Sequence, residues 1–318
     1  MDNVCHTIVG AAFGEAGLKT RTRFGNPVLM IAANLPDIDV LSFVADTPAV
    51  ALRRGMTHGV LAQALLPIAL TGAVLLFDRW LAPRRGDARA RAAPLLLLSY
   101  IGVLSHVALD WLNNYGVRLL MPYSNRWFYG DSVFIVDPWL WLVLGLGVLL
   151  ARRRGRPMMA ILGLVVASAY IAGMVLSARA ARHHVLEVWT REHGRPPTDL
   201  MVGPSFLNPL RRTIILEAGD HYRTGRFYWW PRRVQFNDQT VPLNKDAPAA
   251  VRAREDARVR AVLVWARFPY YQLSPVDGGI RVSLGDMRFM ARVGGISVVV
   301  PDGVRPGSGP GKTSPERQ

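Results

Sequence analysis

His106 and Asp110 lie four residues apart, a spacing that puts both side chains on one face of a helix, where they can reach the same ion. Asp37 and Asp39 lie in the segment NLPDID. Because Pro36 disfavours a helix at the residue before it, we expect these two carboxylates in a turn, from which alternate residues can converge on one or two cations. A solvated loop with an aspartate that caps a helix is the alternative for this segment.

His6 and His58 each lie at an end of an apolar segment, as His106 does. An ionisable residue at membrane depth is costly unless it is paired or binds a ligand. A single histidine at an interface needs no function, but all three are expected at the same face as five aspartates, which are Asp37, Asp39, Asp110, Asp131 and Asp137. This convergence favours a functional site. We expect Asp131 and Asp137 either to support that site or to cap the next helix.

Neutral imidazoles and carboxylates together form a ligand set suited to Zn, Mn or Fe. Three imidazoles and three carboxylates are more ligands than one tetrahedral zinc ion needs, so we expect one or two divalent ions. Such a centre lowers the pKa of bound water to near neutrality and orients a phosphoryl or acyl group. The sequence has no GxSxG segment, and Cys5, its single cysteine, has no evident base. We therefore expect metal-activated water rather than a covalent nucleophile.

The elements that position these residues are expected to be membrane helices. The 318-residue chain is 50% hydrophobic and only 19% charged, with a mean hydropathy of +0.17, which excludes a mainly disordered protein. Four uncharged runs approach or reach the length of a spanning helix: residues 59–77, 92–109, 138–151 and 157–178. The third run needs residues 132–136 (SVFIV) as an N-terminal extension. Residues 3–14 and 24–36 are too short to span with certainty, and we expect re-entrant, tilted or partly buried helices there.

Arginines predict the orientation in the membrane. If every apolar stretch crosses, Lys19, Arg21 and Arg23 share one side with five arginines of residues 79–91 and four of residues 152–156. That side should be cytoplasmic. The candidate metal site and the C-terminal half would then lie outside the cytoplasm, periplasmic or extracellular. The net charge of +15 is therefore attributed to membrane loops, and we expect membrane lipids rather than nucleic acid as partners.

The C-terminal part of the chain has the composition of a β-rich domain. Residues 227–230, 261–268, 280–293 and 296–300 are rich in β-branched and aromatic residues and are separated by Pro, Gly and Asp. We expect a transmembrane helical domain over residues 1–178, a β-rich extracytoplasmic domain over 179–302 and a disordered tail over 303–318. The predicted fold is mainly α, a polytopic transmembrane helical bundle with a smaller β-rich extramembrane domain.

The order of the motifs resembles the bacterial family of predicted membrane-bound metal-dependent hydrolases, which includes LexA-regulated inner-membrane proteins. The motifs are an N-terminal histidine, NLPDID, R-G-x-T-H before an apolar helix, and S-H-x-x-x-D-x-x-N. The resemblance covers about residues 1–140 and implies a location in the bacterial inner membrane. It implies metal ligands at His6, Asp37, Asp39, His58, His106 and Asp110, with Asn34 and Asn113 as supporting groups.

These observations predict a membrane-bound hydrolase that acts on an ester or phosphoester, in a lipid or in an envelope-associated molecule. Two alternatives stay open. The His/Asp cluster could serve an ion or solute transporter, which carboxylates in mid-membrane would favour. It could also hold a structural metal in a non-catalytic scaffold, against which a coordination position open to water would count.

Overall fold

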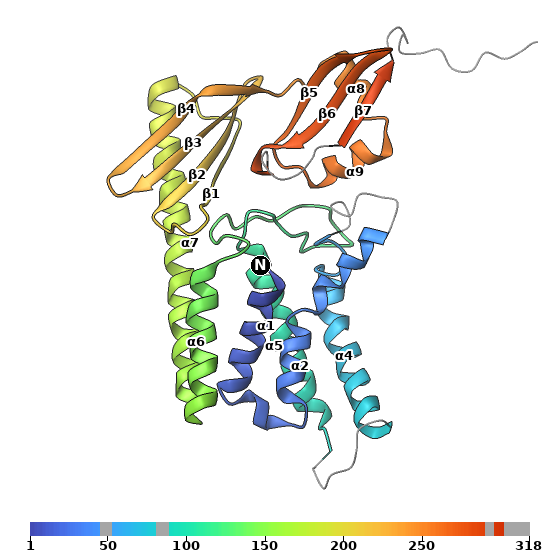
Figure 1. The fold of residues 1–318 in the computed structure, drawn as a ribbon, viewed down its shortest axis with the longest axis vertical. Helices are drawn as coiled ribbons and strands as arrows, with labels where there is room; N and C mark the ends of the chain where they lie inside the picture. Colours follow the sequence, from blue (N-terminus) through green and yellow to red (C-terminus); the bar gives the residue numbers. More distant parts are fainter. Residues whose placement is uncertain (45–52, 81–88, 290–295, 302–318) are drawn as a thin grey trace, which may run out of the picture. The chain divides into compact units, whose positions relative to one another are not determined.

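The computed structural model describes residues 1–44, 53–80, 89–289 and 296–301. Most of the first 193 residues are helical, and two β-sheets follow (Figure 1). The helical elements of this first part are α1 (Asn3–Glu15), η1 (Leu18–Arg21), α2 (Gly25–Ala32), η2 (Leu35–Val44), α4 (Val60–Trp80), α5 (Ala92–Trp111), α6 (Pro138–Arg154) and α7 (Pro157–His193).

Three of these helices, α4, α5 and α7, are long and apolar enough to cross a membrane. They contain three of the four predicted spanning runs. Many of their large apolar side chains, such as Leu65, Leu97 and Val165, are exposed, as expected for helices whose surroundings are hydrocarbon. Helix α7 continues well beyond its apolar run and ends at His193, so the first residues expected in the β-rich domain are helical.

The expected extension of the third run is wrong. Helix α6 has 17 residues and begins at Pro138, a residue that favours the first helical position. The side chain of Asp137 caps this helix by accepting hydrogen bonds from the backbone N–H groups of Trp139 and Leu140. Residues 132–136 therefore lie outside the helix, and α6 is shorter than the three candidate spans.

The short helices α1 and α2 pack among the long ones. Helix α1 contacts α2, α5, α6 and α7, and α2 contacts α5 (Figure 1). The approach of α2 to α5 is close because Gly102 has no side chain: a Cβ there would lie 2.4 Å from the Cβ of Ala32. This contact brings the C-terminal end of α2 against the α5 turns that carry the candidate ligands.

Two sheets form the C-terminal region, as the composition predicts. Strands β1 (Asp199–Pro204), β2 (Arg211–Ala218), β3 (His221–Trp229) and β4 (Arg232–Pro242) form one sheet in this order. Its apolar face covers the second half of α7, where Val185 and Trp189 pack against residues such as Ile214 and Phe227. The compact unit that contains the bundle therefore extends to Val241, past the boundary expected after residue 178.

The second compact unit begins at Pro242. It contains α8 (Pro248–Ala253), α9 (Ala257–Trp265), β5 (Pro269–Val276), β6 (Gly279–Asp286), η3 (Met287–Phe289) and β7 (Ile296–Pro301). The expectation of a strand over residues 261–268 is wrong, because most of this segment is α9, which Asp256 caps at its N-terminus. The predicted tail, residues 303–318, lies outside the described residues.

Candidate metal centre

Helix α5 positions two candidate ligands, His106 and Asp110, one turn apart at its C-terminal end, and both side chains are fully buried. The Nδ1 atom of His106 lies 2.7 Å from the backbone oxygen of Ala33, just after α2. A carbonyl oxygen can only accept, so Nδ1 carries the proton and Nε2 presents a lone pair. A backbone carbonyl behind a histidine is the usual partner that orients a metal-ligating imidazole.

His58 lies just before α4 and is held in a similar way. Its Nδ1 atom lies 3.0 Å from the hydroxyl oxygen of Thr57, which donates to Asp39 Oδ2 at 3.2 Å. The hydroxyl therefore accepts from Nδ1 of His58, whose Nε2 also presents a lone pair. Burial lowers the pKa of His58, which keeps the ring neutral near pH 7 and able to bind a metal.

Asp37 and Asp39 belong to η2, a 3₁₀ helix, where the sequence predicted a turn. With three residues per turn, side chains two positions apart point in different directions. Asp37 accordingly lies beside the histidines, whereas Asp39 accepts hydrogen bonds from Thr57 and from the backbone N–H of Arg54, the latter at 2.6 Å. Asp39 thus holds the segment that carries His58.

Four buried side chains form the candidate metal group, which we define as Asp37, His58, His106 and Asp110. One ligand atom from each lies within 4.8 Å of all the others. The Nε2 atoms of His58 and His106 are 3.1 Å apart. Asp110 Oδ2 lies 3.3 Å from the Nε2 atom of His58 and 3.6 Å from the Nε2 atom of His106. Asp37 Oδ1 lies 3.9 Å from each of these two Nε2 atoms.

These separations fit one bound cation. Ligand atoms about 2.0–2.1 Å from a tetrahedral zinc ion lie about 3.3 Å from each other. Moreover, the two facing Nε2 lone pairs repel each other unless a cation or a proton lies between them. The chemistry of the donor set therefore fits a divalent metal, although the metal's identity does not follow from it.

His6, on α1, lies next to this group. Its ring stacks on that of His106, with centroids 3.8 Å apart, and its Nε2 atom lies 3.3 Å from Asp110 Oδ1. The structure thus brings all six predicted ligands into one buried neighbourhood. Four of them form the candidate metal group, His6 flanks it, and Asp39 supports it from behind.

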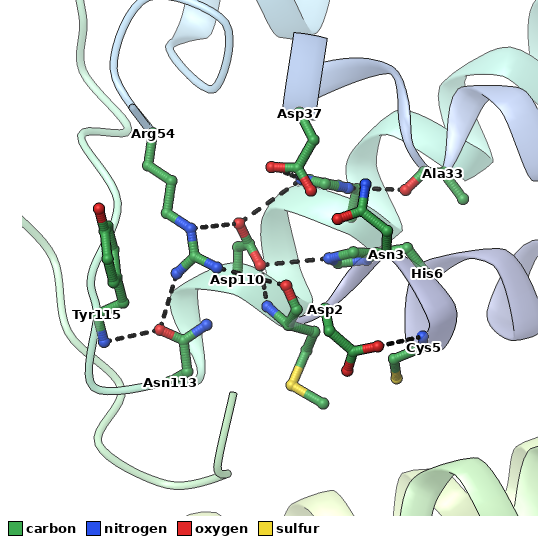
Figure 2. Close-up of polar contacts among 12 residues, drawn as sticks. Asp2, Asn3, Cys5, His6, Ala33, Asp37, Arg54, Asp110, Asn113 and Tyr115 are labelled. Atoms are coloured by element: carbon green, nitrogen blue, oxygen red, sulfur yellow. Dashed lines mark hydrogen bonds and ion pairs between the residues drawn. The ribbon is translucent and has the colours of Figure 1, made fainter. Parts of the chain in front are cut away.

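Arg54 is a further site residue, and its guanidinium is buried beside Asp110 (Figure 2). Its Nε atom lies 2.9 Å from Asp110 Oδ2, its Nη1 atom donates to Asn113 Oδ1 at 2.9 Å, and the guanidinium lies over the ring of Tyr115. The amino group of Met1 contacts the other oxygen of Asp110. Arg54 was not among the predicted site residues, although its place in R-G-x-T-H was a usable signal.

The predicted supporting residues have different positions. Asn113 accepts from Arg54 and from the backbone N–H of Tyr115 and so orients the arginine. Asn34 donates to Thr7 and to the carbonyl of Met30, which links α1 to the end of α2. Asp131 is not part of the candidate metal group and lies in the loop before α6, where its carbonyl accepts from Arg212.

Comparisons with known proteins agree with the resemblance seen in the sequence. A family model described as YdjM inner membrane protein matches residues 1–181, which include the whole candidate metal group. The chain is also similar to the uncharacterized protein YfhP of Bacillus subtilis (strain 168), with 23% identity over 193 residues. This match covers 57% of the chain and 56% of YfhP, so the chain spans about half the length of that relative. No solved structure matches the chain.

Proposed function

Because the chain belongs to the YdjM inner membrane protein family, we propose that it is a polytopic inner-membrane hydrolase whose candidate metal group binds a divalent cation. The reaction would be hydrolysis of an ester or phosphoester in a lipid or an envelope-associated molecule. The observation that carries this proposal is the convergence of two imidazole lone pairs and two carboxylates in one buried place. Zn is the expected ion, with Mn or Fe as alternatives.

A divalent cation held by these residues supplies a Lewis acid that activates water near neutral pH and polarises the scissile group. The chain's own residues perform the positioning. The carbonyl of Ala33 and the hydroxyl of Thr57 hold the two rings with Nε2 inward, and Arg54 holds the Asp110 carboxylate. Their burial excludes bulk water, which strengthens every electrostatic interaction within the site.

The charges around the group favour an anionic substrate. Three carboxylates, of Asp37, Asp39 and Asp110, lie against two guanidinium groups, of Arg53 and Arg54. These five side chains together carry a net charge of −1, and a divalent cation would change the net charge of the site to +1. Arg53 lies 3.5 Å from Asp37 and is partly exposed, so it can meet an incoming anion. We therefore favour a phosphoester over a carboxylic ester.

The orientation is part of the proposal. The arginine-rich loops predict that the end of the bundle with the metal group faces away from the cytoplasm, together with the C-terminal region. In that compartment the protein would meet envelope molecules rather than nucleic acid.

Activity assays test the proposed reaction. Purified protein in detergent would be reloaded with Zn, Mn or Fe and incubated with phosphate monoesters, phosphate diesters, carboxylic esters and phospholipids. We expect a metal-dependent release of product from a phosphoester, abolished by chelator and by His106→Ala. Activity that survives both treatments would come from another enzyme and would refute the assignment. Absence of turnover on every substrate, from protein with a full metal content, would favour a structural metal.

A further inference from the structure

An open groove adjoins the candidate metal group. It has a volume of about 440 Å³ and lies between α1 and the segment formed by α2 and η2. Asp37, a member of the metal group, lines this groove. The groove and the proposed reaction site therefore share a residue.

The walls of this groove are mainly apolar. Met30, Ile31, Leu35 and Ile38 line it, and the side chains of Ile31 and Ile38 are 50% and 46% exposed. Asn3, Thr7, Asn34 and Asp37 also line the groove and contribute a smaller polar surface. Apolar side chains that remain exposed beside a buried charged group are suited to a ligand with a hydrocarbon chain and a polar head.

If α5 crosses a membrane, its length places the metal group at the level of lipid headgroups. Helix α5 has 20 residues, so it is about 30 Å long, which is the thickness of the hydrocarbon core of a bilayer. Asp110 is the penultimate residue of this candidate span. If α5 crosses the membrane, the metal group lies at the end of the hydrocarbon core, where phosphate and ester groups of lipids lie.

We propose that this groove binds the alkyl chain of a phosphate-bearing membrane lipid and so makes such a lipid the substrate. The inference rests on the proposed function for the role of the metal group. The head of the lipid lies against the metal group and Arg53, and the chain lies along Met30, Ile31, Leu35 and Ile38. The lipid reaches the site sideways from the bilayer, with its chain still in apolar surroundings.

Alkylphosphonates of increasing chain length are suitable probes, because each has an anionic head and no bond that a hydrolase can cleave. Their binding to the metal-loaded protein would be measured by equilibrium dialysis in detergent, at concentrations below micelle formation. We expect affinity to rise with each added methylene, by about fourfold where the methylene leaves water, until the groove is full. Methylphosphonate measures the head alone.

The double variant Ile31→Gln/Ile38→Gln should remove most of this dependence on chain length, with metal content and methylphosphonate affinity unchanged. Leu65→Gln is the matched control, because Leu65 is 60% exposed on α4 and does not line the groove. It should behave as the parent protein. If the double variant loses metal, the single Ile31→Gln variant replaces it and should flatten the dependence in part.

Equal affinity for all chain lengths in the parent protein would overturn the proposal. The proposal would also be overturned if the groove variants kept the parent's dependence of affinity on chain length. The same holds if Leu65→Gln reduced this dependence as much as the groove variants do. The outcome is independent of the proposed reaction. If affinity depends on chain length but no ester is turned over, the groove binds the alkyl chain and the proposed hydrolysis is refuted. If an ester is turned over but affinity does not depend on chain length, hydrolysis stands and the groove does not bind the chain.

Discussion

The Nε2 atoms of His58 and His106 lie 3.1 Å apart, although the partners of both Nδ1 atoms leave a lone pair on each Nε2. Two such atoms repel each other unless a cation or a proton lies between them. Asp110 Oδ2 and Asp37 Oδ1 face the same point, so the arrangement suits a bound divalent cation.

Substitution of the α5 ligands should separate metal binding from insertion. We expect His106→Ala and Asp110→Ala each to lower metal content strongly, because each removes one of the four converging groups. Membrane insertion should continue, since neither change adds a charge to the uncharged run of residues 92–109 in α5. Metal content per molecule and membrane yield are the measurements. His183→Ala is the control, because that side chain is 75% exposed on α7. Full metal content in both α5 variants would remove the HxxxD pair from the site.

The two aspartates of η2 should respond differently to the loss of charge. Asp37→Asn should lose metal, because it removes a charged oxygen that faces both histidines. Asp39→Asn should keep most of its metal, because its amide oxygen can still accept from Arg54 and Thr57, at a cost of a few tenths to about 1 kcal/mol.

Metal content and melting temperature, each with and without chelator, distinguish the two η2 variants. The chelator effect on melting temperature should shrink for Asp37→Asn and persist for Asp39→Asn. Equal loss of metal in both would make Asp39 a ligand, as the sequence suggested. Unchanged metal in both would leave η2 with a structural role only.

Arg54→Met should increase the protein's dependence on metal. The guanidinium, the Met1 amino group and a bound cation would all compensate the buried charge of Asp110, so removal of Arg54 leaves a larger share of that charge to the metal. We expect a loss of about 3–5 kcal/mol in the stability of the metal-free protein. The increase in melting temperature on addition of metal should be larger than in the parent. An equal or smaller increase would show that Arg54 does not balance this charge.

The sequence was sufficient to predict the neighbourhood of the site. The i, i+4 spacing of His106 and Asp110 determines a shared helix face, and the apolar runs determine the ends at which the other candidates lie. It was not sufficient to divide roles within the neighbourhood. Asp37 and Asp39 separate because η2 is a 3₁₀ helix rather than a turn, and this conformation depends on tertiary contacts with residues 53–58.

At two places, a helix-capping residue determined the secondary structure, although the composition of the segment favoured another one. Residues 132–136 are apolar enough to extend α6, but Asp137 and Pro138 start the helix after them. Residues 261–265 have the composition of a strand, but the Asp256 cap starts a helix there. In both places, an aspartate that accepts from the first backbone N–H groups outweighed side-chain preference.

Reporter fusions test the proposed orientation. A fusion at Arg154, in the last turn of α6, should report the cytoplasm, because four arginines lie in residues 152–156. A fusion after Ala178 should report the periplasm. Reversed reporters would refute both the orientation and the external location of the site.

The metal content of the purified parent protein tests the central claim most directly. Protein extracted in mild detergent and exchanged into metal-free buffer would be analysed for all first-row transition metals. The proposed function predicts at least one tightly held divalent ion per chain, released by strong chelator and regained on addition of Zn, Mn or Fe. A protein that is folded by melting analysis, yet holds no metal as purified and binds none on addition, would contradict the claim.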